Sequence, residues 1–302
     1  MQTATQPTMR GPGDDHWKLT GGVDRAVREI TDGDSSSAQA DELSELRHQQ
    51  DELRRTVFEA AQMQRRLCGP RYLRRGSYTL AGELFPVQHV SGDFLSVFER
   101  GSRLIFALGD IAGKGLRAGM WFTHVVGLIR TSINRNEPAA AMSVINRELY
   151  NTEFAPLTSL FLASLDLQSD EITYCNAGHP PSLMMRHSGT VEPLHIGGPI
   201  LGAVPEAEYA AGRIRLEAGD SLLSFSDGIM ESRNPLGSEF GTERLILAAK
   251  NATYSSATDK LFSLLGTVAD FVSPGPREDD FAVLWLNRDG EDPFVAKEPQ
   301  VR

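Results

Sequence analysis

The sequence predicts an α+β fold in which antiparallel sheets follow one long N-terminal helix. Between residues 41 and 68 the apolar residues recur at alternating steps of three and four, a spacing typical of a helix. After Gly69-Pro70, short apolar runs typical of strands occur together with amphipathic helical patterns. The strand-like runs cluster without strict strand–helix–strand alternation, which favours antiparallel sheets over a doubly wound parallel sheet.

The two ends of the chain lack the patterns of a packed structure. Residues 1–40 are polar and glycine-rich and show no sustained apolar period, so we expect a disordered N-terminal segment. Residues 289–302 are charged and contain proline, and we expect them to form a loose tail.

The segment 41–68 is predicted to be a helical linker with a heptad seam. Six of the eight seam positions are apolar, and the eight are Leu43, Leu46, Gln50, Leu53, Val57, Ala60, Gln64 and Leu67. Because the charged residues lie off the seam, the pattern predicts a coiled coil of about 25 residues, roughly 37 Å long, that joins two chains into a homodimer. The two polar seam positions leave a second interpretation open, an amphipathic helix that packs on its own domain.

The remaining segment, 69–288, is predicted to be one domain of strands and helices. Strands are expected at Tyr78–Phe85, Leu104–Leu108, Leu157–Leu167, Ile172–Cys175, Ser182–Met185, Ser221–Phe225 and Phe281–Leu286. Helices are expected at Leu116–Ile133, Pro138–Leu149, Thr242–Ala249 and Thr258–Phe271. Proline suits the first turn of the second of these helices, where its missing N–H is not needed.

The charge, the apolar stretches and the cysteines of the chain indicate which partners and which compartment to expect. The formal net charge of −10 over 302 residues argues against nucleic acid or an anionic membrane surface as the main partner. No apolar stretch approaches the roughly 20 residues that span a bilayer, and no targeting signal opens the chain. The two cysteines form no metal-binding pair and no disulfide framework. These features predict a soluble, acidic, cytoplasmic protein.

The stretch FALGDIAGKG, residues 106–115, is similar at first sight to a phosphate-binding loop. A P-loop needs Gly-x-x-x-x-Gly-Lys-Ser/Thr, but Leu108 occupies the place of the first glycine and Gly115 that of the hydroxyl residue. What remains is an apolar run that presents Asp110 at its end.

Several other acids occupy similar positions beside glycine or at the edge of a predicted strand. They are Asp93, Asp227 and the pair Asp279-Asp280. Carboxylates on rigid strand ends are suitable ligands for hard cations such as Mg²⁺ or Mn²⁺. Each aspartate alone is also an ordinary turn residue, and spacing in the sequence does not show that these acids converge.

Five motifs, in order, decide between these interpretations: Ser91-Gly92-Asp93-Phe94, Gly109-Asp110-Ile111-Ala112-Gly113-Lys114-Gly115, Asn176-Ala177-Gly178-His179-Pro180-Pro181, Ser226-Asp227-Gly228 and Asp279-Asp280-Phe281. Together they resemble the PPM-type metal-dependent protein serine/threonine phosphatases, and most closely the bacterial SpoIIE/RsbU branch. The resemblance covers residues 45–287. It implies a four-layer αββα sandwich of two antiparallel sheets flanked by helices, in a bacterial cytoplasmic protein.

The resemblance also implies a site for two divalent cations, Mn²⁺ or Mg²⁺. Asp110 would bridge both metals, the carbonyl of Ile111 would bind one, and Asp227 and Asp279 would be further direct ligands. Asp93 matches an acid that holds metal-bound waters, and Asp280 would lie behind the ligands. Ser91, Ala112 and Ala282 depart from the family's usual residues without removing a ligand, although Ser91 could alter the approach to Asp93.

The implied reaction is hydrolysis of phosphoserine or phosphothreonine by metal-activated water. His179 is expected to be structural, holding the turn before Pro180. Lys114 is expected either to attract phosphate or to be a solvated turn lysine. The branch implies that the substrate is a phosphorylated STAS-type antagonist of an anti-sigma factor.

Two rival functions remain to be tested. Cys68-x5-Arg74 matches the loop of cysteine-dependent phosphatases, but Pro70 lacks one of the N–H groups that such a loop needs, and the segment ends a helix instead of following a strand. The other rival is a non-catalytic phosphoprotein-binding scaffold of the same fold.

Overall fold

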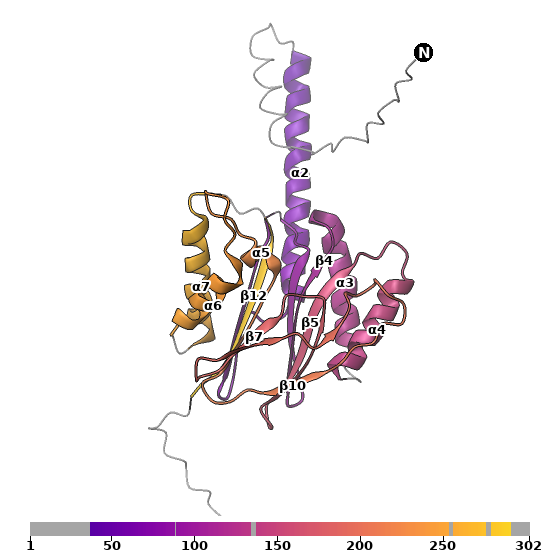
Figure 1. Ribbon diagram of the computed structural model, residues 1–302. Helices are drawn as coiled ribbons and strands as arrows, with labels where there is room; N and C mark the ends of the chain where they lie inside the picture. The colour runs from indigo at the N-terminus through magenta and orange to yellow at the C-terminus, as the bar shows by residue number, and fades with distance from the viewer. Residues whose placement is uncertain (1–36, 88, 134–136, 254–255, 276–278, 291–302) are drawn as a thin grey trace, which may run out of the picture. The chain divides into compact units, whose positions relative to one another are not determined.

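The computed structural model describes residues 37–87, 89–133, 137–253, 256–275 and 279–290 (Figure 1). By their contacts these residues divide into two units, one that ends at Arg55 and one that begins at Thr56. Helix α2, Ser37–Leu67, runs through the boundary and begins four residues before the predicted start. The other residues of the expected N-terminal disordered segment, and residues 291–302 of the expected tail, lie outside the described residues.

The first sheet, sheet A, has six strands in the order β1-β2-β12-β11-β7-β8, and every neighbouring pair is antiparallel. The strands are β1 (Tyr72–Arg75), β2 (Tyr78–Phe85), β12 (Phe281–Arg288), β11 (Ser221–Phe225), β7 (Ser182–Met185) and β8 (Val191–Leu194). The second strand of the domain, β2, and the last, β12, are thus neighbours in the middle of this sheet.

The second sheet, sheet B, has the order β10-β6-β5-β4-β3, again with antiparallel neighbours. A two-residue strand, β9, pairs with β6 in parallel, which is a local exception to the antiparallel prediction. The strands are β10 (Gly212–Arg215), β6 (Glu171–Ala177), β5 (Thr158–Asp166), β4 (Arg103–Ile111), β3 (Asp93–Arg100) and β9 (Gly197–Gly198).

Helices cover the outer face of each sheet, so the domain has four layers (Figure 1). Two pack on sheet B, α3 (Gly115–Ser132) and α4 (Pro138–Asn151). Two pack on sheet A, α6 (Gly241–Asn251) and α7 (Ala257–Val272), and the single turn α5 (Asp227–Met230) follows β11. The predicted αββα sandwich is therefore confirmed.

Strand β12 shows why the central strands appear in the sequence as continuous apolar runs. Ala282, Leu284 and Leu286 belong to the core between the two sheets. Val283 and Trp285, which alternate with them, belong to the core under α6 and α7. Successive side chains of a strand point to opposite faces, so a strand covered on both faces needs apolar residues at every position.

Strand β3 is the main element that the apolar runs did not predict. Its pattern is interrupted by the buried Ser96, and the strand begins at an acid, Asp93. The short strands β1, β8, β9 and β10 were also missed. The omission matters because β3 pairs with β4 and places Asp93 directly opposite Asp110.

The last turns of α2 belong to the second unit, which begins at Thr56, and hydrogen bonds tie them to its other elements. The side-chain amide of Gln64, a polar seam position, donates to the Ser91 carbonyl at 2.8 Å and accepts from the Ser91 N–H at 3.2 Å. Arg130 of α3 donates to the carbonyl of Leu67 at 3.1 Å. The polar residue at this seam position, Gln64, is therefore explained by contacts within its own unit.

No described helix is long and apolar enough to cross a membrane.

Candidate metal centre

Three carboxylates from separate segments meet at one end of the sandwich. Asp93 opens β3, Asp110 lies one residue before the end of β4, and Asp227 follows β11 of the other sheet. Each offers an oxygen, and these three oxygens all lie within 4.8 Å of one another. The structure thus brings together three of the acids named from the sequence, a proximity that their spacing alone did not show.

Ser226 joins the two sheets at this point. Its hydroxyl donates to Asp93 Oδ2 at 2.5 Å and accepts from the backbone N–H of Ala282 at 2.9 Å. The side chain is fully buried, so these bonds are shielded from water. Sequence reasoning gave Ser226 no role, although its place directly before Asp227 was a usable signal.

Gly92 leaves room for a cluster of oxygen atoms. A Cβ added to this residue would lie 2.8 Å from the carbonyl oxygens of Ile111 and Gly113, and 3.1 Å from Asp110 Oδ1. Two backbone carbonyls and a carboxylate therefore face one small space. Because Mg²⁺ and Mn²⁺ prefer oxygen ligands, this donor set fits a hard divalent cation. The carbonyl predicted to be a ligand, that of Ile111, is one of them.

Asp280 holds the loop that precedes β3. Its Oδ1 accepts from the N–H of Val87 at 2.6 Å, and its Oδ2 accepts from the hydroxyl of Ser91 at 2.9 Å and the N–H of Gly92 at 3.2 Å. Both oxygens of this buried carboxylate thus hold Val87, Ser91 and Gly92 in place through hydrogen bonds. The side chain of Ser91, a departure from the family's usual residue, is thus hydrogen-bonded to Asp280.

Asp279 does not belong to the mutual cluster of the three aspartates. Its Oδ1 accepts from the ammonium of Lys114 at 2.7 Å, and both side chains are substantially exposed, at 43% and 59%. In this arrangement Asp93 is a member of the cluster, and Asp279 forms an ion pair with Lys114. Lys114 is accordingly an ion-paired residue at the rim of the centre.

Two of the clustered carboxylates, Asp93 and Asp110, have raised pKa values and are protonated more readily than ordinary aspartates. Burial, followed by the nearby charges of Asp227 and Asp279, raises the pKa of Asp110 to about 6. Burial raises the pKa of Asp93 well above its usual value, although the Ser226 hydroxyl opposes this effect. Without a cation, ionising this cluster costs free energy, and a bound divalent cation would offset that cost.

His179 lies in a turn behind the centre. Asn176 holds the turn, accepting from the His179 N–H at 2.8 Å and donating to its carbonyl at 2.9 Å. The His179 ring contacts the hydroxyl of Ser159 through Nδ1 at 2.8 Å, and Ser159 is the register partner of Asp110. Burial lowers the pKa of His179 to about 3, so its ring is neutral near pH 7.

Cys68 lacks the environment of a nucleophilic cysteine. It is buried where α2 ends, and its carbonyl accepts from the N–H of Val97 at 2.8 Å. Burial raises the pKa of the thiol to about 11. The residues after it enter β1, so the strand–loop–helix setting of a cysteine-dependent phosphatase is missing from this part of the structure.

Comparison with known proteins was made for both sequence and structure. The model of the stage II sporulation protein E (SpoIIE) family matches residues 100–289. Protein IcfG of Synechocystis is 22% identical over 67% of this chain, and the match spans 37% of IcfG. Phosphoserine phosphatase RsbU of Bacillus subtilis is 24% identical over 80% of this chain and 73% of RsbU.

Solved structures share the fold. The SiaA-PP2C domain of Pseudomonas aeruginosa superposes with a TM-score of 0.69 at 17% identity, covering 80% of this chain and 98% of that domain. RsbX, solved in complex with magnesium, superposes with a TM-score of 0.55 at 16% identity, covering 71% of this chain and 97% of RsbX. At these identities the likeness concerns the fold alone.

Proposed function

Because the chain belongs to the SpoIIE family, we propose that it is a metal-dependent protein phosphatase that hydrolyses phosphoserine or phosphothreonine on a regulatory protein. The observation that carries the proposal is the meeting of Asp93, Asp110 and Asp227 beside the oxygen-lined space at Gly92. The relative RsbU, a phosphoserine phosphatase by name, supports the same reaction class.

The proposed cofactors are two divalent cations, Mn²⁺ or Mg²⁺. Asp110 and the Ile111 carbonyl would hold them together with Asp227 and Asp279, and Asp93 would take part directly or through water. When bound, the cations offset the charge of the carboxylates and of the phosphate, and lower the pKa of coordinated water towards about 7. The relative RsbX, solved with magnesium, supports this choice of metal.

The chain's own residues would position the reactants. Asp280 fixes the Ser91–Gly92 loop and so the start of β3, while Ser226 holds the carboxylate of Asp93. Lys114 lies at the rim with a largely exposed side chain, and its ammonium would attract a substrate phosphate that carries about −1.5 to −2 charge. Its present partner, Asp279, would then be released towards the metals.

The proposed substrate is a phosphorylated STAS-type antagonist of an anti-sigma factor, as in partner switching. A phosphatase of this kind would return the antagonist to the form that captures its kinase. We further propose that the chain forms a homodimer through the seam of α2. In the N-terminal unit Leu46 and Leu53 have exposed fractions of 55% and 60%, which leaves apolar surface for a second helix.

The alternative function is a phosphoprotein-binding scaffold without turnover. The two are distinguished by incubating the full chain with a phosphoserine peptide and Mn²⁺, with and without EDTA, and measuring released phosphate. Asp227→Asn should abolish release, whereas the control Asp270→Asn, an exposed acid on α7, should retain it. Peptide binding without phosphate release in the wild type would favour the scaffold.

A further inference from the structure

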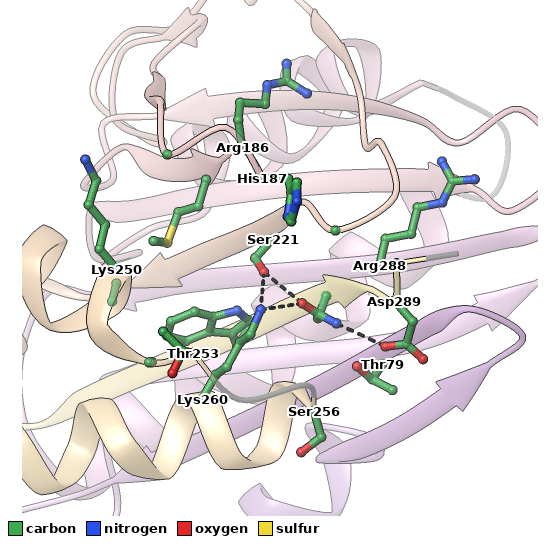
Figure 2. A pocket seen from close by; sticks show the side chains of 18 of the residues that line it. Thr79, Arg186, His187, Ser221, Lys250, Thr253, Ser256, Lys260, Arg288 and Asp289 are labelled. Atoms are coloured by element: carbon green, nitrogen blue, oxygen red, sulfur yellow. Dashed lines mark hydrogen bonds between the residues drawn. The ribbon is translucent and has the colours of Figure 1, made fainter. Parts of the chain in front are cut away.

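A cavity of about 840 Å³, shown from close by in Figure 2, lies at one end of sheet A. The clustered aspartates lie at the other end, since Asp227 follows the last residue of β11 and Ser221, its first residue, lines the cavity. Strand β12 begins beside Asp279 and ends at Arg288, which lines the cavity, and its residues 281–287 span roughly 20 Å. The walls come from the β7–β8 turn, the ends of β11 and β12, and helices α6 and α7. Pockets for small molecules usually measure roughly 300–1,000 Å³, so the cavity can hold such a ligand.

Lys260 of α7 presents a partly buried ammonium group to this cavity. Its Nζ donates to the hydroxyl of Ser221 at 3.0 Å and to Asn287 Oδ1 at 2.7 Å, and it lies 6.0 Å from the ring centre of Trp285. These partners are all neutral. Among the described residues no carboxylate forms an ion pair with Lys260, and burial lowers its pKa, although the nearby charge of Asp289 opposes this effect. An ammonium group has three donors, so one remains for a ligand.

His187 faces Lys260 across Ser221 (Figure 2). The backbone N–H of His187 donates to Asp220 Oδ1 at 2.9 Å, which fixes the turn. Its ring packs on Gly219, where an added Cβ would lie 2.9 Å from Nδ1. The imidazole is therefore held at the cavity by a specific backbone arrangement.

The arginines of the cavity are already paired, and the lysines are not. Arg186 is bound to Asp220 at 2.8 Å, Arg288 to Asp170 at 2.9 Å, and Arg74 at 3.1 Å to Asp289, a carboxylate that also lines the cavity. Within the described part of the chain neither Lys250 nor Lys260 has an ion-pair partner. The cavity thus carries unneutralised positive charge in a chain whose formal net charge is −10. Such a local excess of donors favours an anion.

We propose that this cavity binds a small organic anion whose phosphate or carboxylate group lies between Lys260 and His187. The apolar part of the ligand packs against Met185, Val191 and Ala252 of the walls. The anion supplies the charge that the ammonium lacks and accepts its third hydrogen bond. This site is separate from the metal centre and does not depend on the proposed function.

The test is isothermal titration of the metal-free full chain, in EDTA, with adenosine 5′-monophosphate and with citrate. We expect at least one to bind, adenosine 5′-monophosphate if the site takes phosphate and citrate if it takes carboxylate. Lys260→Met should weaken that binding about 10- to 100-fold, the usual effect of losing a hydrogen bond from a charged group. His187→Ala, at an exposed residue, should weaken it without affecting folding.

Two controls separate this site from others. Arg213→Met removes a positive charge on β10 of the other sheet and should leave the affinity unchanged. Asp110→Asn should also leave it unchanged, because the metal centre is not involved. The proposal is wrong if neither anion binds the wild type at millimolar concentration. It is equally wrong if both cavity variants bind as the wild type does, or if binding is lost in Asp110→Asn.

Discussion

Replacing Asp110 with Asn should abolish metal binding and yet stabilise the metal-free protein. The side chain keeps its shape and loses its charge, so core packing is unaffected. In the wild type, Asp93, Asp110 and Asp227 offer oxygens within 4.8 Å of one another. Two unit charges at that distance repel by about 1 kcal/mol in water and about 3.5 kcal/mol at an effective dielectric constant of 20. The substitution removes two of the three pairs.

The magnitude follows from the pKa of Asp110, which is raised from 3.8 to about 6, first by burial and then by its acidic neighbours. Two pH units correspond to about 3 kcal/mol, and partial exposure of the side chain reduces this to about 2 kcal/mol. For a domain of this size that is a rise in Tm of about 4–8 °C.

The sign depends on pH. Between about pH 4 and 6 the folded protein holds a proton on Asp110 that the unfolded chain has released, so stability falls as pH rises through this window. Asparagine has no such dependence. The Tm advantage of Asp110→Asn should therefore be small at pH 4 and complete at pH 8.

The assay is thermal unfolding of both proteins in EDTA at the two pH values, followed by titration with Mn²⁺. Asp280→Asn is the matched control, because that carboxylate accepts three hydrogen bonds and its loss should lower the Tm. Mn²⁺ should stabilise the wild type and not Asp110→Asn, whose phosphatase turnover should fall by several orders of magnitude. A lower Tm for metal-free Asp110→Asn, or wild-type Mn²⁺ affinity, would refute the reasoning.

Three further outcomes are expected. Gly92→Ala should weaken Mn²⁺ binding in titration calorimetry at least tenfold, since its Cβ would lie 2.8 Å from two carbonyl oxygens. The control Gly127→Ala, which has open space around it on α3, should bind Mn²⁺ as the wild type does. Equal affinities of the two variants would contradict a metal site in the oxygen-lined space at Gly92. Cys68→Ser should keep phosphatase activity within a few-fold of the wild type. It should lose about 1–3 kcal/mol of unfolding free energy, because a hydroxyl replaces a buried thiol. Complete loss of activity in a folded variant would support the cysteine mechanism instead. Leu46→Glu combined with Leu53→Glu should give monomers in sedimentation and change kcat or the apparent Mn²⁺ affinity. A monomeric wild type, or unchanged kinetics of the double variant, would contradict regulation through the heptad seam of α2.

Much of the fold could be predicted because local physics determines it. The run that forms β2, Tyr78–Phe85, was predicted with its observed bounds, since a strand covered on both faces needs consecutive apolar residues. The helix at Pro138 was predicted from its first-turn proline and its apolar face. Strand β3 was missed because the polar Ser96, buried in the structure, interrupts the apolar run.

The candidate site was predictable as a set of residues but not as a geometry. The motifs named Asp93, Asp110 and Asp227, and the resemblance assigned direct-ligand roles to Asp110 and Asp227 and the holding of metal-bound waters to Asp93. The geometry came from the structure, in which Asp93 joins the cluster while Asp279 pairs with Lys114. Sequence spacing determines which face of a strand a residue occupies, and it contains no distance between strands.

The sequence by itself determined the α+β class, the long N-terminal helix and the acids at strand ends, because periodicity and turn chemistry act over a few neighbouring residues. Only the tertiary structure decided that Ser226 binds Asp93 across the two sheets, and that Gln64 of α2 holds the Ser91 backbone. Only the tertiary structure placed Lys260 in the wall of the basic cavity, next to the ring of Trp285. These contacts join residues far apart in the chain, and their partners are selected by the packing of the two sheets and their helices, which no local pattern encodes.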